Sequence, residues 1–514
     1  MKLKLLDPEF KPRLYQELIA STAIKKNTIC ILPTGLGKTH VSILVAAYRL
    51  EKFPESKILM LAPTRPLVNQ HMKVFKKYLI GKDEDFISLT GKIHANDRKI
   101  LYQNGKIFFA TPQLIKNDVE NKILDLKDVK LLVVDECHRS MKNYAYTSIV
   151  DEYVKTNSDP LVLGLTASPG GIEDKIEEVK KNLHAEAVEI RTEKDADVSP
   201  YVQETKVEKV FVELPKEFRE IKETLEKIYN QKIYDLIRAK VIPSTKISKK
   251  ELLVAQLELG RIYNQNKDWQ ALKAIISCAQ AIKVGHAIEL IETQGVSVLT
   301  QYLTKLTKDK QSSATRRLLE DYRIKKAIEL TEKLNEKRVE HPKLEELLKI
   351  VNNEVKKKPN AKIIVFANYR DSVEKIAKSL EKNGIEAREF YGQAKKSGKG
   401  LSQKGQIEII NEFELNLFNV LVATSVAEEG LSIPAVDIVI FYEPVASEIR
   451  TIQRRGRTGR TEAGRVIFLI TKNTRDEWYY WSAYNKEKRM NRILKGLKEG
   501  DYKQKKTITD FVRK

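Results

Sequence analysis

Short apolar runs closed by a polar or turn-forming residue constrain the fold of this chain more than any other feature. Before residue 200 they read NTICIL, SKILMLAP, GKIFFATP, VKLLVVDE and PLVLGLTAS, and amphipathic helical windows separate them. Such runs, bounded by Pro, Thr, Asp or Ser, are typical of strands buried on both faces, and intervening helices make the strands parallel. The chain up to about residue 200 is therefore predicted to form an α/β domain.

The same pattern returns near residues 350 to 472, where AKIIVFAN, FNVLVATS, VDIVIFYEP and GRVIFLIT predict a second parallel sheet. Between the two sheets, from about 215 to 342, long windows with few glycines carry apolar residues at spacings of three and four, which predicts helices. The predicted division is an α/β domain at 1–200, an all-helical insertion at 201–342, a second α/β domain at 343–480 and a basic C-terminal helix and tail at 481–514.

The charge balance indicates a polyanionic partner. With 92 Lys and Arg against 70 Asp and Glu, the formal net charge is +22, so the average surface potential is positive and nucleic acid is the favoured partner. A Lys/Glu-rich surface of the thermophile kind is the other interpretation of this excess. The basic run RRLLEDYRIKK in the helical insertion is likewise either a solvated face or a grip on nucleic acid.

The number of cysteines and the length of the apolar runs indicate the cellular compartment in which the chain works. Cys30, Cys137 and Cys278 are the only cysteines, far apart and odd in number, so neither a disulfide framework nor a cysteine-based zinc site is predicted. The longest apolar runs fall far short of the ~20 residues that span a bilayer, and the N-terminus shows no cleavage site. We expect a chain without a membrane anchor, cytoplasmic and associated with the nucleoid, or nuclear in a eukaryote.

The segment ILPTGLGKTH is a candidate phosphate-binding loop. It lies between the run NTICIL and a helical window, at a strand-to-helix turn where backbone N–H groups and the helix dipole attract phosphate. Gly35 and Gly37 let the backbone approach a ligand closely. Lys38 would pair with the β and γ phosphates, and Thr39 would place its hydroxyl on Mg²⁺. Leu32 stands where the pattern G-x-x-x-x-G-K-[ST] has glycine. The predicted ATP-binding residues of the loop are Pro33, Thr34, Gly35, Leu36, Gly37, Lys38, Thr39 and His40.

A pair of carboxylates at the end of another buried strand would complete such a site. In VKLLVVDECH, Asp135 can hold Mg²⁺ through its water shell, and Glu136 can accept the proton of the attacking water. Acidic residues also cap strands for structural reasons, but the upstream loop favours the catalytic interpretation. The expected cofactors are ATP and Mg²⁺.

Seven phrases in order, PTGLGKT, APTRPL, TPQLI, DECH, TAS, VATSVAEEGLSIP and QRRGRTGR, resemble motifs I, Ia, Ib, II, III, V and VI of superfamily 2 helicases. RLYQ, just upstream, resembles the adenine-reading Q motif of that family. The superfamily writes motif I as [AP]-T-G-x-G-K-T, so Leu32 does not depart from it. The resemblance spans nearly the whole chain and implies two RecA-like parallel-sheet domains, with ATP bound between them.

A narrower resemblance lies outside these motifs. HAIELIETQGVSVLTQYL in the insertion and YGQAKKSGKGLSQKGQIEIINEF in the second α/β domain are similar to archaeal Hef and the Fanconi anaemia M group of branched-DNA translocases. That group usually has alanine where this chain has Cys137, and DECH is better known from RIG-I-like RNA sensors. Because a small spacer is needed at this position, the departure carries little weight.

The superfamily resemblance implies roles for individual residues. Gln16 would read adenine, and the arginines of QRRGRTGR would stabilise charge developing at the γ-phosphate once the two domains close. The implied catalytic residues are Lys38, Asp135, Glu136, Gln453, Arg457 and Arg460. The residues that would couple nucleotide state to strand contacts are His138, Thr166 and Ser168. Loop residues that would grip the sugar-phosphate backbone, without reading sequence, are Thr64, Arg65, Thr111 and Thr424.

These features favour an ATP-driven helicase or translocase that acts on forked or branched DNA in replication-fork repair, with the helical insertion recognising DNA shape. The alternative is a double-stranded-RNA-stimulated ATPase like RIG-I or the Dicer helicase region, which DECH and the insertion permit. No Cys-rich zinc domain, ribonuclease domain or signalling domain supports that alternative. A scaffold with an inactive ATPase is disfavoured because every residue needed for hydrolysis is present.

The C-terminal segment suggests further contacts. In DEWYYWSAYNKEKRMNRILKGLKEGDYKQKK, a helix that docks its aromatic face on the second α/β domain is favoured over a base-stacking surface. KKTITDFVRK resembles a sliding-clamp peptide through Ile508 and Phe511, although Gln504 is one place too early for the usual spacing. No E-R-K-x-x-x-D nuclease signature occurs, so cleavage is not predicted. A sliding clamp and a separate nuclease are candidate partners.

Overall fold

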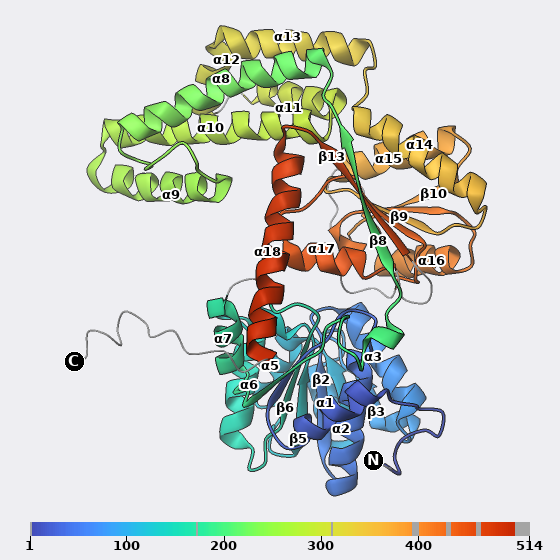
Figure 1. The fold of residues 1–514 in the computed structure, drawn as a ribbon. Coiled ribbons are helices and arrows are strands. Elements are labelled where there is room, and N and C mark those ends of the chain that lie inside the picture. Colours follow the sequence, from blue (N-terminus) through green and yellow to red (C-terminus); the bar gives the residue numbers. More distant parts are fainter. Residues whose placement is uncertain are drawn as a thin grey trace.

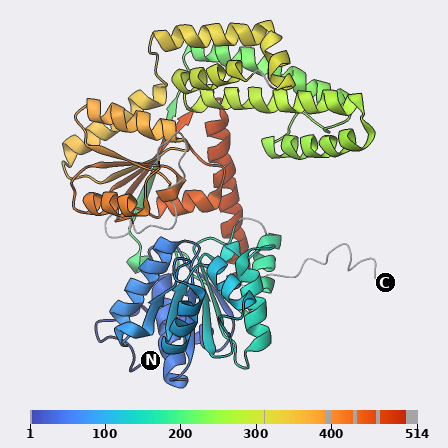
Figure 2. The same cartoon turned by 180° about the vertical axis from the view of Figure 1, so that it is seen from behind.

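The chain forms three parts, and Figure 1 shows the second α/β domain between the first α/β domain and a bundle of helices. The computed structural model describes residues 3–170, 173–309, 312–392, 400–427, 433–458 and 464–498. In the view from behind (Figure 2), the long helix α18 (Arg475–Lys498) runs from the bundle past the second domain to the first. The expected fold class, two parallel-sheet domains with a helical insertion, is confirmed.

The first domain is built on a parallel sheet with the strand order β3-β4-β2-β5-β6-β1-β7. The five predicted apolar runs form β1, β2, β4, β5 and β6, which are almost wholly buried because helices cover both faces. The edge strands β3 and β7 are short and partly exposed, and they were not predicted because neither contains an apolar run. The strands are β1 (Thr28–Ile31), β2 (Lys57–Leu61), β3 (Phe86–Ser88), β4 (Ile107–Ala110), β5 (Val129–Val134), β6 (Val162–Thr166) and β7 (Ala187–Ile190). The α-helices are α1 (Leu14–Ala23), α2 (Lys38–Lys52), α3 (Arg65–Tyr78), α4 (Ala95–Asn104), α5 (Pro112–Glu120), α6 (Ala145–Thr156) and α7 (Glu173–Asn182).

The second sheet, in the order β10-β11-β9-β12-β13-β8, corrects the predicted domain boundaries. Strand β8 (Thr205–Val212) pairs along its whole length with β13 (Gly464–Thr471), so the insertion predicted to begin at residue 201 begins only with helix α8 at Lys216. Strand β8 was missed because it is an exposed edge strand in which charged and apolar residues are interleaved, and because its partner comes far downstream. The boundary predicted at residue 480 falls inside α18. The other elements are β9 (Ile363–Phe366), β10 (Ala387–Phe390), β11 (Val420–Ala423), β12 (Ile438–Phe441), α14 (Pro342–Lys357), α15 (Arg370–Lys382), α16 (Gln403–Glu414) and α17 (Glu448–Arg455).

The helical bundle is organised around α10. This helix has the length and composition of a membrane span, but 61% of its most apolar window is buried within the bundle, where it packs on α8, α9, α11 and α12. Burial in a protein core therefore accounts for its apolar sequence. The bundle consists of α8 (Lys216–Arg238), α9 (Lys249–Asn266), α10 (Trp269–Thr293), α11 (Val296–Lys308), α12 (Ser313–Glu320) and α13 (Tyr322–Glu336).

Two buried ion pairs stabilise this part of the chain: one joins α8 and α10 within the bundle, and the other joins the starts of α14 and α18. Lys343 at the start of α14 donates to Asp476 of α18 at 2.7 Å, and both side chains are fully buried. Within the bundle, Lys222 pairs with the buried Glu292 at 2.9 Å. The ring of His341 hydrogen bonds to the carbonyl oxygen of Glu292 at 2.9 Å, which joins the start of α14 to α10. A buried charge is costly without its partner, so each ion pair stabilises its own part of the chain, and the hydrogen bond of His341 to Glu292 ties the bundle to the second domain.

Candidate active site

The phosphate loop lies between the end of β1 and the start of α2. Gly35 and Gly37 have φ angles of 85° and 80°, in the left-handed region that disfavours other residues. A Cβ atom on Gly37 would collide with Gln16 Nε2 and would lie 2.6 Å from His40 Nδ1. The backbone angle therefore favours glycine at residue 37, and any other residue would also displace the side chains of Gln16 and His40.

Leu32 is a core residue of the first domain. Its side chain is fully buried, and its N–H donates to the carbonyl of Thr166 at the end of β6 at 3.1 Å. The ammonium group of Lys38 donates to the carbonyl oxygen of Leu32 at 3.1 Å, so the lysine lies back over the loop. A lysine and free N–H groups at the start of a helix form a site suited to phosphate.

A histidine that no motif indicated connects the two halves of the site. Nε2 of His71 lies 2.8 Å from Oδ2 of Asp135, and its Nδ1 lies 3.3 Å from Oγ1 of Thr39. His71 comes from α3, and its ring is buried. The one available signal in the sequence is its spacing, because His71 lies on the apolar face of α3 between Val68 and Phe75. The two residues predicted to serve Mg²⁺ are thus held together through one imidazole.

The environment of Asp135 favours its charged form. Burial by itself raises the pKa of this carboxyl, but His71 and Lys38 outweigh burial, and the pKa lies below its ordinary value. The backbone carbonyl of Asp135 accepts a hydrogen bond from the hydroxyl of buried Tyr146 at 2.8 Å, which fixes the end of β5. Asp135 is therefore an ionised and oriented carboxylate.

Glu136, His138, Thr166 and Ser168 form one chain of contacts. Nδ1 of His138 lies 3.2 Å from Oε2 of Glu136 and 3.1 Å from Oγ1 of Thr166. Oγ1 of Thr166 accepts a hydrogen bond from the N–H of Ser168, and the hydroxyl of Ser168 contacts Sδ of Met490 in α18 at 3.0 Å. The structure thus brings the predicted coupling residues together and extends their chain to α18.

Gln16 bridges helix α1 and the phosphate loop. Its Oε1 accepts from the N–H of Arg13 at 2.9 Å, and its Nε2 donates to the carbonyl of Leu36 at 3.0 Å. The hydroxyl of Tyr15 donates to the same carbonyl at 2.8 Å. Adenine reading by Gln16 stays a prediction, whereas its support of the loop is direct.

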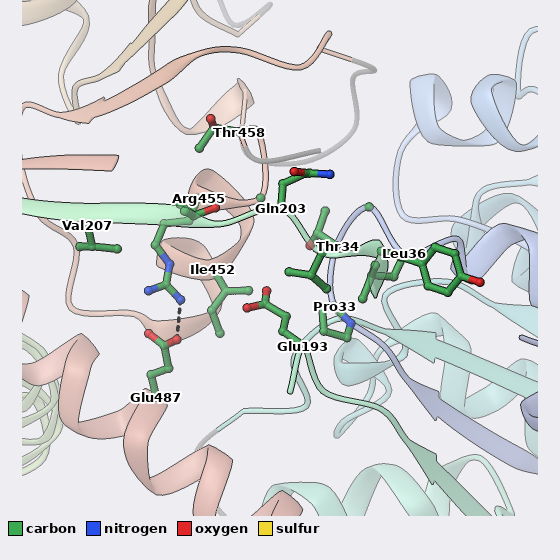
Figure 3. Close-up of a pocket in the computed structure, with 15 residues that line it drawn as sticks. Pro33, Thr34, Leu36, Glu193, Gln203, Val207, Ile452, Arg455, Thr458 and Glu487 are labelled. Atoms are coloured by element: carbon green, nitrogen blue, oxygen red, sulfur yellow. Dashed lines mark hydrogen bonds and ion pairs between the residues drawn. The ribbon is translucent and has the colours of Figure 1, made fainter. Parts of the chain in front are cut away.

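A cleft of about 290 Å³ is lined by the phosphate loop and by Arg455, Gly456 and Thr458 of the second domain (Figure 3). Thr34 of the loop faces Gly456 so closely that a Cβ on Gly456 would lie 2.8 Å from Cβ of Thr34. Arg455 forms an ion pair with Glu487 of α18 at the border of this cleft. Sequence analysis did not single out this pair, because Glu487 lies in a separate helix beyond the last strand.

Of the residues predicted to act from the second domain, Gln453, Arg457 and Arg460, neither of the two that the structure describes lines this cleft. Gln453 and Arg457 are 6% and 8% exposed and lie within the second domain, and Arg460 lies outside the described residues. The neighbouring Arg454 is fully buried, donates to Asn368 Oδ1 at 3.2 Å and belongs to the domain core. Contact of Arg457 with a γ-phosphate stays a prediction that requires the domains to move.

The predicted backbone-gripping residues lie beyond the carboxyl ends of strands. Thr64 and Thr111 are the residues before α3 and α5, and they follow β2 and β4, which pair side by side. Arg65 is the first residue of α3. In the second domain, Thr424 follows β11, and its N–H donates to the carbonyl of Phe390. Helix N-termini at one sheet edge are suited to phosphate, but nucleic-acid contact by these residues stays a prediction.

The residues present fit ATP with Mg²⁺. Lys38, the hydroxyl of Thr39 and the carboxylate of Asp135 converge beside the loop. Within the described ranges, no group of three or more His, Cys, Asp or Glu side chains could hold a metal alone. Mg²⁺ commonly takes one or two protein ligands together with nucleotide phosphates and water, which agrees with this set.

Three family models match successive parts of the chain. The model for the res subunit of type III restriction enzymes matches residues 9–171, the helical-bundle model of ATP-dependent RNA helicases matches 217–338, and the helicase conserved C-terminal domain matches 342–462. Together with the phosphate loop and carboxylates, these matches define the class of protein: an ATP-hydrolysing helicase with two RecA-like domains.

Individual relatives narrow the family. The crystal structure of the Pyrococcus furiosus Hef helicase domain is 44% identical, with a TM-score of 0.72, over 92% of this chain and 98% of that one. A Methanocaldococcus jannaschii protein named for ATP-dependent RNA helicase activity is 44% identical over 96% of this chain and 62% of its own length. The DNA helicase Fml1 of Schizosaccharomyces pombe is 34% identical over 89% of this chain and 57% of its own length.

The chain belongs to the superfamily 2 helicases of the Hef and Fanconi anaemia M type. It spans about three fifths of the two relatives from Methanocaldococcus jannaschii and Schizosaccharomyces pombe, and a quarter of the mouse Fanconi anaemia group M homologue, which is 31% identical over 92% of this chain.

Proposed function

We propose that this chain is an ATP-driven helicase or translocase that acts on forked or branched DNA. The observation that carries this proposal is a basic groove of about 430 Å³ on the helical bundle, between α8, α10 and α12. Lys232, Lys273 and Arg317 line it. The acidic lining residue Asp235 pairs with Arg238 at 3.4 Å, and among the described residues none of the three cations has an ion-pair partner. Unpaired cations in a groove are suited to the phosphates of a duplex arm.

The geometry supports a cycle in which ATP binding closes the cleft. The N–H groups of the loop and Lys38 would bind the phosphates, and Asp135, held by His71, would orient Mg²⁺, which supplies charge neutralisation at the phosphates. Glu136 would accept the proton of the attacking water. Gly456 already lies against Thr34 of the loop, so closure would bring Arg457 toward the phosphates, and the contacts from His138 to Met490 would carry the change to α18.

Double-stranded RNA is the second candidate substrate. Two observations favour it: the first domain carries DECH, and the relative from Methanocaldococcus jannaschii is named for RNA helicase activity. The DNA proposal is supported by relatives named as DNA helicases in Schizosaccharomyces pombe and Sclerotinia sclerotiorum. DNA is favoured because one of the two Hef-like phrases of the sequence, HAIELIETQGVSVLTQYL, lies in the same insertion that carries the basic groove.

The experiment compares ATP hydrolysis stimulated by forked DNA, a four-way junction, linear duplex DNA, single strands and duplex RNA. We expect the strongest stimulation by forked or four-way DNA. Stimulation by RNA alone would overturn the DNA proposal. The triple variant Lys232→Ala/Lys273→Ala/Arg317→Ala should weaken fork binding and reduce the slope of log affinity against log salt by about 2 to 3, because each phosphate contact contributes about 0.9.

The matched control neutralises three lysines of the first domain that lie at the amino ends of its strands, at the opposite edge of the sheet from the predicted gripping residues. Lys25, Lys26 and Lys127 are exposed and lie before β1 and β5, at the amino ends of the strands. The variant Lys25→Ala/Lys26→Ala/Lys127→Ala removes the same charge away from the predicted gripping residues. It should leave the fork affinity nearly unchanged, and an equal loss in both triple variants would indicate an effect of net charge rather than of the groove.

Two partner predictions concern segments beyond this site. The clamp-peptide resemblance at Ile508 and Phe511 lies outside the described residues. We propose a sliding clamp and a separate nuclease as partners, on the basis of the sequence resemblance alone. Binding of a purified clamp to the full chain and to the Phe511→Ala variant tests the first of these.

A further inference from the structure

The connection between the two α/β domains passes the phosphate loop. The short helix η3 (Ser199–Tyr201) ends the first domain, and β8 of the second sheet begins at Thr205. Tyr201 and Gln203 of this connection line the same cleft as Thr34 and Leu36 of the loop, and Figure 3 shows Gln203 beside Thr34. No helicase motif of the sequence includes this connection.

Tyr201 has a position suited to a stacking partner. Its ring centroid lies 4.3 Å from Cζ of Arg13, and it meets the ring of Tyr15 edge-on with centroids 5.9 Å apart. Arg13 donates to the hydroxyl of Tyr15 at 3.0 Å, and that hydroxyl donates to the carbonyl of Leu36. The Arg13 guanidinium is thus anchored to the phosphate loop through Tyr15, and the ring of Tyr201 lies against it.

Other aromatic rings near the loop are engaged in the domain core. His40 packs against Phe10 and Tyr78, with centroids 5.4 Å apart in each case, and Tyr15 is fully buried. Tyr201 is 42% exposed. Among the described residues that line the cleft, it is the one aromatic side chain. A purine attached to phosphates on the loop would therefore meet Tyr201 as its available aromatic surface.

We propose that Tyr201 forms an aromatic wall for the nucleobase of bound ATP, beside Arg13, and that it transmits base binding to the second domain. The inference rests on the proposed ATP-driven function and adds a specificity residue to it. Only residues 202–204 separate Tyr201 from β8, which is paired to β13 over its full length. A base that stacks on Tyr201 therefore acts on a segment continuous with the second sheet.

The test compares two ligands that share phosphates but differ in the base. Calorimetry with Mg²⁺ measures the affinity of the β,γ-imido analogue of ATP and of inorganic tripolyphosphate for the full chain. Tyr201→Ala should weaken binding of the ATP analogue about tenfold, as expected when an aromatic stacking partner of a base is removed. It should leave the affinity for tripolyphosphate within about twofold, whereas Tyr201→Phe and Tyr201→Trp should retain the wild-type preference for the ATP analogue.

Tyr322→Ala is the control, because Tyr322 is 76% exposed and lies in the helical bundle. Equal weakening of both ligands by Tyr201→Ala would overturn the proposal, since the ring would then only hold the connection in place. Unchanged binding of both ligands would also overturn it. Failure of the wild-type chain to bind the ATP analogue at all would instead refute the proposed ATP-driven function.

Discussion

His71 offers the sharpest test of the geometry at the hydrolysis site. Its imidazole lies 2.8 Å from Asp135 and 3.3 Å from Thr39, so it holds the predicted magnesium carboxylate against the predicted magnesium hydroxyl. His71→Ala removes both contacts at once. His71→Gln retains an N–H donor that can reach Asp135, but it lacks the second ring nitrogen that reaches Thr39.

The magnitude follows from the burial of Asp135, which is 5% exposed. A buried hydrogen bond to a charged group contributes about 1.5–3 kcal/mol, and about 1.4 kcal/mol corresponds to a tenfold change in rate. If the orientation of Asp135 acts in the transition state, His71→Ala should lower kcat/KM for ATP by roughly ten- to hundredfold. His71→Gln should lower it by less.

The pKa of Asp135 sets the sign of a matching change in stability. Burial would raise this pKa, yet His71 and Lys38 hold it below its ordinary value. A carboxyl with a lowered pKa in the folded state stabilises that state above its unfolded pKa and loses this contribution as pH falls through the folded value. His71→Ala should therefore be less stable than wild type at neutral pH, and the difference should shrink in acid.

The assay is steady-state ATP hydrolysis at saturating fork DNA over a range of Mg²⁺ concentrations. The apparent Mg²⁺ requirement should rise in His71→Ala. His94→Ala, which alters an exposed histidine before α4, serves as the control and should match wild type. Wild-type kcat/KM and Mg²⁺ dependence in His71→Ala would refute the bridging role.

Three further results should follow from the structure. Lys38→Ala should abolish ATP turnover while DNA binding, measured by fluorescence anisotropy, persists; unchanged turnover would refute the site assignment. Gly456→Ala should reduce kcat at least several-fold, because the added Cβ would lie 2.8 Å from Thr34 and oppose closure. Asp476→Asn should destabilise the second domain by about 3–5 kcal/mol in urea unfolding followed by hydrogen exchange, because it leaves Lys343 buried without its charge partner.

Two control variants match these substitutions. Gly405→Ala adds a Cβ whose nearest neighbour, Ser402 Oγ, would be 3.5 Å away, so kcat should not change. Glu345→Gln breaks an exposed pair with Lys349 and should leave stability unaltered. A loss in either control equal to that of its partner variant would contradict the steric or the burial argument.

Periodic apolar runs were a sufficient guide to the central strands of both sheets, because a strand buried on two faces has to be apolar throughout. They failed at the edges. Strand β8 reads TKVEKVFV, and none of its residues is fully buried, so nothing local shows that it joins a sheet whose other strands begin after residue 360. The start of the helical insertion, predicted at residue 201 from the change in hydrophobic pattern, was therefore placed before the true start at Lys216.

The sequence by itself determined the chemistry of the phosphate loop, the acidic pair and the family. The loop and the acidic pair are short contiguous motifs whose residues must stand at fixed spacing, and the family follows from several such motifs in order. Tertiary structure decided what depends on separate elements meeting in space. His71 reaches Asp135 from another helix, Glu487 pairs with Arg455 from α18, and Tyr201 lies beside Arg13 through the connection between domains. Contacts between distant segments leave no local periodicity, because packing and not spacing along the chain brings them together.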